Sequence, residues 1–380
     1  MEILFRVYHG FSEASGISKK IHAQVTGLQQ NGHEVHLCYY DFAADGHRCR
    51  FVDGRVIADY GNGWCAALRQ RTGYGNIYDY CVRQDIQMVY ARSFQNATPW
   101  LIHLFARLRK AGIRSVTEIP TYPYDQEFVG FPLVARLGLK VDQLFRKRLS
   151  REMEALVTFS DAVEIFGQRT IRISNGVDFD AIPLHSPHSV TDNTVHVICV
   201  AEVHYWHGFD RLIAGLGEYR RHCPDGRRVV FHIVGGLGPL EKNDSVHAPG
   251  ILKLIERYQL HDVVVLHGQL FGDALNELFN QCQFAIGSLA RHRSGITAIK
   301  TLKNREYASR GIPFMYSEHD SDFDSQPYVL RVPADETPID ICQMLDFIDR
   351  HSFSPQTIRN SIAHLSWKEQ MGKVIMAVAD

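Results

Sequence analysis

Short apolar segments rich in β-branched residues alternate with segments of helical periodicity along nearly the whole chain. This alternation constrains the fold most, because it is typical of βα units built around a parallel sheet. Strands are expected near 2–8, 34–40, 86–91, 113–118, 155–159, 170–173, 195–201, 229–234, 263–267, 284–288 and 312–316. Helices are expected between them, near 16–31, 62–83, 98–111, 133–153, 208–221, 250–259, 273–282 and 299–310.

A polar segment rich in Pro, Ser, Asn and Thr interrupts this alternation at 181–194. A chain of 380 residues is long enough for two ordinary domains. We therefore expect two doubly wound, Rossmann-like α/β domains over 1–182 and 190–365, followed by a terminal helix over 366–380. Ligands of open parallel sheets bind beyond the carboxyl ends of the strands, so the site residues are expected there.

Charge and cysteine content narrow the class of protein. Lys plus Arg total 41 and Asp plus Glu total 42, so the net charge of −1 gives no general attraction to nucleic acid. The eight cysteines form no CxxC pair, which indicates free thiols in a reducing compartment. No segment has the character of a signal peptide or a membrane span. A cytoplasmic protein that does not bind nucleic acid is expected.

Glycine-rich loops follow several of the expected strands. The first strand leads into 9-HGFSEASG, where Gly10 and Gly16 precede a helix whose first N–H groups can hold a phosphate. The segments 174-SNGVD, 235-GGLGP and 268-GQLFG also follow strands. Glycine lets a flat base or a diphosphate approach the backbone, although each loop alone is also explained as an ordinary turn.

The densest polar segment is 291-RHRSGITAIKTLKNREYASRGIPF. On a helix from about 299, Lys300, Lys303 and the pair Glu306–Tyr307 share one face near the strand ends. Cations there suit a diphosphate, and a carboxylate suits paired sugar hydroxyls because it accepts two hydrogen bonds. The competing interpretation is a solvated helix face with an i,i+3 ion pair.

The segment 303-KNREYASRGIPF, taken with 174-SNGVD, 207-HGFDRL, 235-GGLGP and 268-GQLFG, resembles the retaining glycosyltransferases of the GT4 type, which have the GT-B fold. The segments 118-EIPTYPYDQE, 205-YWHGFDRLI and 288-SLARHR are similar to a bacterial branch associated with capsular and other surface polysaccharides. The resemblance covers most of the chain. It implies an acceptor-side N-terminal domain, a C-terminal nucleotide-sugar domain, a cleft between them, and a terminal helix that crosses back to the N-terminal domain.

The resemblance also implies roles for individual residues. The carboxylate of Glu306 would bind the ribose of the donor nucleotide, and the glycine loops would contact its base and diphosphate. The expected donor-binding residues are Gly16, Gly235, Gly236, Gly268, Lys300, Lys303 and Glu306.

Three positions depart from the family pattern. Ala298 stands where a glutamate usually precedes Glu306, and Glu202 and His207 stand where a phosphate-binding arginine and lysine are usual. The best substitutes for neutralising the diphosphate are His292, Arg293, Lys300 and Lys303. The expected catalytic residues are Glu118, His292, Arg293 and Lys303, with Glu118 in the place of a family histidine.

The acceptor side is expected in the loop after the strand near 113–118. This loop would carry Glu118, Tyr122, Tyr124, Asp125 and Glu127. Carboxylates and tyrosines there can hydrogen-bond sugar hydroxyls. The alternative is a rigid Pro-Tyr loop with an exposed acid cluster.

The helix expected over 131–151 is basic and amphipathic. Its apolar residues recur at helical spacing: Val134, Leu137, Val141, Leu144 and Phe145. The segment contains one acidic residue, Asp142, and six basic residues: Arg136, Lys140, Arg146, Lys147, Arg148 and Arg151. Such a helix can dock on anionic lipid, so peripheral contact with the inner face of the cell membrane is one expectation. A core-packed helix with a solvated basic back fits the same pattern.

These features together indicate a glycosyltransferase that moves a sugar from a nucleoside diphosphate sugar to a growing, lipid-linked surface glycan. The resemblance implies retention of configuration. No metal or other cofactor is expected, because cationic side chains and helix N-termini can stabilise the leaving diphosphate. The alternatives are a nucleotide-sugar epimerase of the same fold and a non-catalytic subunit that binds nucleotide sugars.

Overall fold

The computed structural model describes residues 1–12, 16–93, 96–125, 133–187, 193–223, 226–237 and 250–379. The chain divides into two compact units, one containing Met1–Gly176 and Leu365–Asp380 and the other Val177–His364. The division lies before the polar segment at 181–194, and the start of that segment is hydrogen-bonded to the second unit. The Arg359 guanidinium donates to the carbonyl of Ile182 at 2.8 Å.

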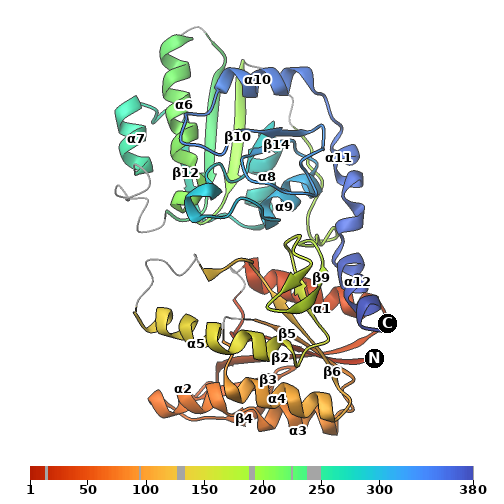
Figure 1. The fold of residues 1–380 in the computed structure, drawn as a ribbon. Coiled ribbons are helices and arrows are strands. Elements are labelled where there is room, and N and C mark those ends of the chain that lie inside the picture. Colours follow the sequence, from red (N-terminus) through yellow and green to blue (C-terminus); the bar gives the residue numbers. More distant parts are fainter. Residues whose placement is uncertain are drawn as a thin grey trace. The chain divides into compact units, whose positions relative to one another are not determined.

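In the described residues of the first unit, nine strands form a sheet in the order β4-β3-β2-β1-β5-β6-β7-β9-β8 (Figure 1). The strands are β1 (Glu2–Arg6), β2 (Glu34–Phe42), β3 (Arg48–Val52), β4 (Arg55–Asp59), β5 (Met88–Arg92), β6 (Arg114–Ile119), β7 (Ala155–Thr158), β8 (Glu164–Ile165) and β9 (Gln168–Arg172). The central strands pair in parallel, as βα units require. The antiparallel hairpin of β3 and β4 was not expected, because arginines interrupt its apolar pattern.

Helices cover both faces of this sheet. They are α1 (Gly16–Gln30), α2 (Gly63–Thr72), α3 (Gly75–Arg83), α4 (Pro99–Lys110), α5 (Leu133–Ser150) and α12 (Trp367–Ala379). Successive residues of a strand point to opposite faces. In β1, Ile3 and Phe5 therefore join the core under α1 and α12, whereas Leu4 joins the core under α3, α4 and α5. The helix expected over 62–83 is interrupted at Gly73.

The terminal helix α12 packs against α1 of the first unit, as expected from the resemblance (Figure 1). Trp367, Met371, Val374 and Val378 form its buried stripe. Gly27 of α1 makes the close approach possible, since a Cβ atom there would lie 2.6 Å from the carbonyl oxygen of Trp367.

In the described residues of the second unit, six parallel strands form a sheet in the order β12-β11-β10-β13-β14-β15. The strands are β10 (Thr194–Val200), β11 (Arg228–Val234), β12 (Val264–Gly268), β13 (Phe284–Ile286), β14 (Phe314–Tyr316) and β15 (Val329–Arg331). The helices are α6 (Phe209–His222), α7 (Ile251–Tyr258), α8 (Gly272–Gln281), α9 (Leu302–Arg310), α10 (Ile341–Arg350) and α11 (Pro355–Ser361). The core of this unit joins α6, α7 and α10 to β10, β11 and β13.

Two parallel-sheet α/β units, with a terminal helix that returns to the first, confirm the fold class expected from the sequence. Among the described residues, no helix combines the length and the apolar composition that a membrane span requires.

Candidate functional site

The parallel strands of the second unit bring the loops after β10, β11, β13 and β14 to one edge of the sheet. Tyr307 fixes α9 at this edge and is itself fully buried. Its hydroxyl donates to the carbonyl of Ile286 in β13 at 3.0 Å and accepts from the N–H of Val200 in β10 at 3.2 Å. Lys303 and Glu306, one turn before and one residue before Tyr307, are held near the strand ends by this anchor.

Helix α9 begins at Leu302 and not near 299, which corrects the sequence interpretation. Thr301 caps the helix, since its side-chain oxygen accepts from the N–H of Asn304 at 3.4 Å. The preceding residues are extended, and the N–H of Ile299 donates to the carbonyl of His319 at 2.9 Å. A strand-like partner therefore replaces the first turn of the expected helix.

Lys300 consequently lies outside α9, and its ammonium is 3.8 Å from the Asp322 carboxylate. Asp322 belongs to a buried cluster around Arg305, whose guanidinium also pairs with Asp320 at 2.9 Å. The expectation that Lys300 shares a helix face with Lys303 is wrong, because Lys300 belongs to this ion-pair cluster instead.

Lys303 carries a buried ammonium with no hydrogen-bond partner among the described residues. The nitrogen lies 5.8 Å from the ring centre of Phe209. Burial, followed by the positive charge of Arg291, lowers the pKa of Lys303 below its ordinary value, while Cys199 and Glu318 oppose this shift. A buried, incompletely neutralised cation is a candidate binding group for an anion.

Glu318 follows β14 and is also buried. Within the part of the chain that the structure describes, neither of its carboxylate oxygens has a hydrogen-bond partner. Burial raises the pKa of Glu318, although Arg291 and Lys303 act in the opposite direction. The site therefore contains a buried carboxylate as well as the buried ammonium of Lys303.

Arg291 is the second cation of this group. It begins the 3₁₀ turn η3 (Arg291–Ser294), and its guanidinium lies 5.6 Å from the ring centre of Trp206. Trp206 belongs to η2 (Tyr205–His207) and stacks on His204, with ring centres 4.4 Å apart. Burial lowers the pKa of His207 well below its ordinary value, so this ring is neutral. His207 thus does not replace the cation that the resemblance implies at its position.

Glu306 pairs with Arg310 and not with Lys303. Both contacts from the Arg310 guanidinium, at 2.9 and 3.1 Å, go to the Oε1 atom of Glu306. The Oε2 atom has no protein hydrogen-bond partner among the described residues, and the side chain is partly exposed. Arg310 therefore holds one oxygen of this carboxylate, while the other oxygen can still accept a hydrogen bond.

The glycine loops differ in how strictly they require glycine. Gly235 has a φ of +127°, and a Cβ atom there would lie 1.8 Å from the carbonyl oxygen of Ala201. Its N–H donates to the carbonyl of Gly268 at 2.7 Å, which joins the loops after β11 and β12. A Cβ atom at Gly236 would meet no atom within 4 Å, so the backbone packing requires only the first of these two neighbours to be glycine.

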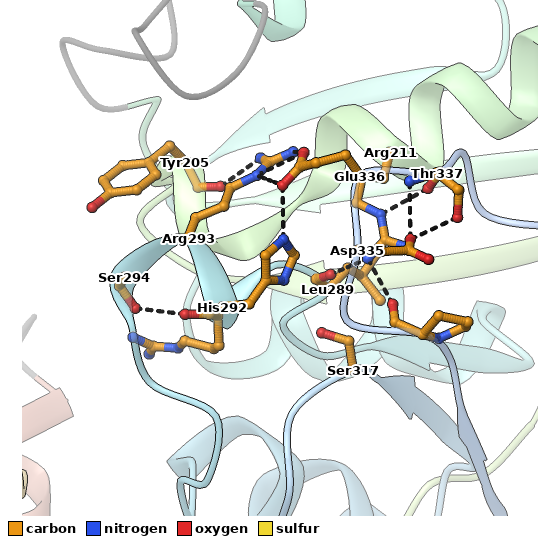
Figure 2. A network of polar contacts seen from close by, with 12 residues as sticks. Tyr205, Arg211, Leu289, His292, Arg293, Ser294, Ser317, Asp335, Glu336 and Thr337 are labelled. Atoms are coloured by element: carbon orange, nitrogen blue, oxygen red, sulfur yellow. Dashed lines mark hydrogen bonds and ion pairs between the residues drawn. The ribbon is translucent and has the colours of Figure 1, made fainter.

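His292 and Arg293, expected to neutralise a diphosphate, instead have carboxylate partners within the second unit (Figure 2). His292 Nε2 lies 2.7 Å from Glu336 Oε1. The Arg293 guanidinium donates to both carboxylate oxygens of Asp210 at 2.8 Å and also pairs with Glu336. These contacts fix η3 to α6 and already neutralise Arg293.

Glu118 lies within β6 and not in the loop after it, which corrects the sequence interpretation. Its side chain is 0% exposed. The Oε2 atom accepts hydrogen bonds from Tyr90 and Gln24, each at 2.7 Å, and the Lys20 ammonium lies 3.4 Å from Oε1. Burial acts against ionisation, but Lys20 and Arg92 together lower the pKa of Glu118. A carboxylate held in this way fixes α1 to the sheet, and its catalytic role stays a prediction.

The loop after β6 is attached to α5 rather than exposed as a row of sugar-binding groups. Tyr124 is buried, and its hydroxyl donates to Asp142 of α5 at 2.6 Å. Asp125 accepts two hydrogen bonds from the Arg146 guanidinium, at 2.7 and 3.1 Å. The expectation of an open acceptor-side cluster is not supported at these two residues.

Three further expected residues lie elsewhere. Tyr122 is half-buried and packs against the apolar core of the first unit. Glu127 lies outside the described residues. Gly16 is the first residue of α1 in the first unit, and a Cβ atom there would meet no atom within 4 Å.

Sequence reasoning missed Glu318 and left Arg291 out of the site. The available signal for Glu318 was its position two residues after the strand expected to end at 316. Its burial depends on contacts between distant segments, which the local sequence does not reveal.

One group of described side chains has the spacing of metal ligands: Glu2, Glu34 and His36. Glu2 and Glu34 begin β1 and β2, at the amino ends of the strands. This edge is opposite to the carboxyl ends where a ligand of a parallel sheet binds.

No protein-family model and no curated protein sequence matches the chain. Among solved structures, the chain is similar to the lipopolysaccharide outer core galactosyltransferase WaaB in its apo form, with a TM-score of 0.62 and 12% identity, covering 100% of this chain and 99% of that one. It is also similar to HepE of Anabaena in complex with UDP-glucose, with a TM-score of 0.55, 14% identity, and coverage of 100% and 98%. A third similar structure is the sucrose-phosphate synthase of Thermosynechococcus elongatus, with a TM-score of 0.54, 13% identity, and coverage of 99% and 94%. Likeness over nearly whole chains, together with the two parallel-sheet units, shows that this chain has the GT-B fold.

Proposed function

We propose that the chain is a retaining glycosyltransferase that moves a hexose-type sugar from a nucleoside diphosphate sugar to a growing, lipid-linked surface glycan. The observation that carries this proposal is the buried ammonium of Lys303 beside Arg291, at the carboxyl edge of the second unit's sheet. A diphosphate at this edge can accept hydrogen bonds from the Lys303 ammonium, which has no hydrogen-bond partner among the described residues.

In this proposal, Glu306 binds the ribose of the donor, and Lys303 and Arg291 bind its diphosphate. Glu306 Oε2 accepts a hydrogen bond from a ribose hydroxyl, while Arg310 holds Oε1. Lys303 and Arg291 stabilise the negative charge that develops on the diphosphate when the bond to the anomeric carbon breaks. The acceptor oxygen forms the new bond on the same face, and its proton passes to an oxygen of the departing phosphate.

The test is incubation of the full chain with UDP-, ADP-, GDP- and dTDP-sugars, first by thermal shift and then by product analysis. A glycosyltransferase is stabilised by its donor, because a ligand that binds only the native state raises the melting temperature. It then releases nucleoside diphosphate slowly without acceptor and faster with one. Interconversion of the sugar without release would indicate the epimerase, and binding without turnover under either condition would indicate a non-catalytic subunit.

We further propose that α5 touches the membrane surface. Three of its apolar residues are not packed in a core, since Val134, Leu137 and Leu144 are 79%, 61% and 73% exposed, whereas Leu139 is buried in the core of the first unit. Arg136 and Lys140 on the same helix are exposed as well. This pattern favours the lipid-docking interpretation of the segment 131–151, whose first two residues lie outside the described part of the chain.

A further inference from the structure

The first unit contains a cavity of about 810 Å³ near the ends of β1 and β5. A polar part of its lining comes from Tyr8, Tyr74, Arg48 and Arg71. Among the described residues that line the cavity there are two arginines and no aspartate or glutamate. The lining therefore has positive charge without a carboxylate of its own.

An apolar part of the lining comes from the first half of α5. Val134, Gly138 and Val141 all contribute to it. These residues belong to the same helix as the exposed Leu137 and Leu144. The cavity thus joins a cationic wall to an apolar helix that continues onto the protein surface.

Two buried arginines pack against the tyrosines that line the cavity. Arg6 is 1% exposed, and its guanidinium carbon lies 4.3 Å from the ring centre of Tyr8 and 5.3 Å from that of Tyr74. Arg50 is also buried, with its guanidinium carbon 5.4 Å from the ring centre of Tyr74. Tyr74 therefore lies within reach of both cations and also lines the cavity.

Neither buried guanidinium has a carboxylate partner in the described residues. The Arg50 guanidinium donates to neutral groups, among them the carbonyl of Gly73 at 2.9 Å. Arg6 Nε and Nη2 have no hydrogen-bond partner within the described chain. A guanidinium stays protonated in proteins, and a buried charge is costly unless an opposite charge lies nearby. An anion in the adjacent cavity would supply that charge.

We propose that this cavity binds the phosphate group of a lipid-linked acceptor, with the start of its hydrocarbon chain on the α5 wall. Arg48 and Arg71 contact the phosphate, and Arg6 and Arg50 add positive potential from behind Tyr8 and Tyr74. This inference rests on the proposed transfer to a lipid-linked glycan, and it specifies the chemical group by which the acceptor is recognised.

The test is calorimetric titration of the full chain with decyl phosphate below its micelle-forming concentration. Inorganic phosphate and decyl maltoside are the two comparison ligands, because the first lacks the hydrocarbon chain and the second lacks the negative charge. We expect saturable binding of decyl phosphate that is about tenfold or more tighter than binding of either comparison ligand.

Two variants change the cavity in different ways. Arg71→Gln removes a cation of the lining and should weaken decyl phosphate binding about tenfold. Gly138→Phe should weaken it similarly by filling the cavity, and a Cβ atom at this position meets no atom within 4 Å, so the helix tolerates the change. Arg69→Gln is the matched control, since Arg69 is an exposed arginine of the same helix α2 that does not line the cavity.

Equal binding of decyl phosphate and inorganic phosphate would overturn the proposed hydrocarbon contact. Absence of saturable binding, or an equal loss in Arg71→Gln and Arg69→Gln, would overturn the site itself. Titration of the same samples with a nucleoside diphosphate separates this inference from the proposed function. Nucleotide binding without decyl phosphate binding contradicts the inference alone, whereas failure of nucleotide binding contradicts the proposed function.

Discussion

The two units present positive charge at the carboxyl edges of their sheets in different ways. In the second unit the cation is Lys303, whose pKa is lowered by burial and by Arg291, with the carboxylate of Glu318 nearby. In the first unit the buried cations are Arg6 and Arg50, which stack on tyrosines and have no carboxylate partner in the described residues. The charge of Lys303 therefore depends on pH near neutrality, whereas the charges of Arg6 and Arg50 do not.

We expect each unit to fold around its own core. The largest effect is expected from a substitution in α12, which packs in the core of the first unit. Trp367 is buried, and a Cβ atom at Gly176 would lie 2.4 Å from its ring. Trp367→Ala leaves a large cavity and should lower the free energy of unfolding of the first unit by about 3–5 kcal/mol. Hydrogen exchange should show lost protection in α1 and β9 but unchanged protection in β10 and α6.

Met376→Ala is the control for this change, because Met376 lies on the same helix and is 63% exposed. It should change the exchange of neither unit. Equal loss of protection in both units of Trp367→Ala would mean that the two cores are not independent.

The difference between the two cations predicts different responses to pH. A lysine with its ordinary pKa stays protonated at pH 9. Because the pKa of Lys303 is lowered to about 7, the small fraction of Lys303 that is still protonated at pH 7.5 should fall more than tenfold by pH 9. Nucleoside diphosphate affinity should therefore fall about tenfold as the pH rises through this range. Decyl phosphate affinity should stay nearly constant, since arginine keeps its charge.

Lys303→Arg is the matched variant for the pH experiment. Arginine keeps a positive charge at this position and does not lose its proton between pH 7.5 and 9. Its nucleotide affinity should no longer depend on pH between 7.5 and 9. A wild-type affinity that is already flat over this range would show that Lys303 does not meet the diphosphate.

The smallest expected effect concerns the surface of α5. An exposed cation near an anionic membrane contributes about 1 kcal/mol to binding, so Lys140→Gln should weaken sedimentation with anionic vesicles about fivefold. Lys110→Gln, which changes an exposed lysine of α4, should have no effect. Equal binding of the wild-type chain to neutral and anionic vesicles would exclude the lipid-docking role.

The sequence was informative where local pattern decides the structure. The central strands and most helices followed from apolar periodicity, and the buried stripe of α12 followed from the spacing of Trp367, Met371, Val374 and Val378. The β3–β4 hairpin did not follow, because Arg50 occupies an inward position that apolar patterning cannot identify.

The candidate site was less predictable for a related reason. The sequence identified Lys303 and Glu306 as close neighbours on a helix, but not the partner that each one finds. Arg310 holds Glu306, and Asp210 and Glu336 hold Arg293, through contacts that depend on tertiary packing. Whether a charge is available to a ligand or already neutralised was therefore decided by residues distant in the sequence.

We propose that the carboxyl edge of the second unit binds a nucleoside diphosphate through Glu306 and Lys303. Calorimetric titration of Glu306→Ala, with the best ligand among UDP, ADP, GDP and dTDP, tests it most directly. Loss of a hydrogen bond to a charged group costs about 1.5–3 kcal/mol, so we predict an affinity roughly 10- to 100-fold below that of the wild-type chain. Glu256→Ala, on the exposed surface of α7, should bind like the wild type. Wild-type affinity in a correctly folded Glu306→Ala variant would show that Glu306 does not bind the nucleotide and would overturn the proposed donor site.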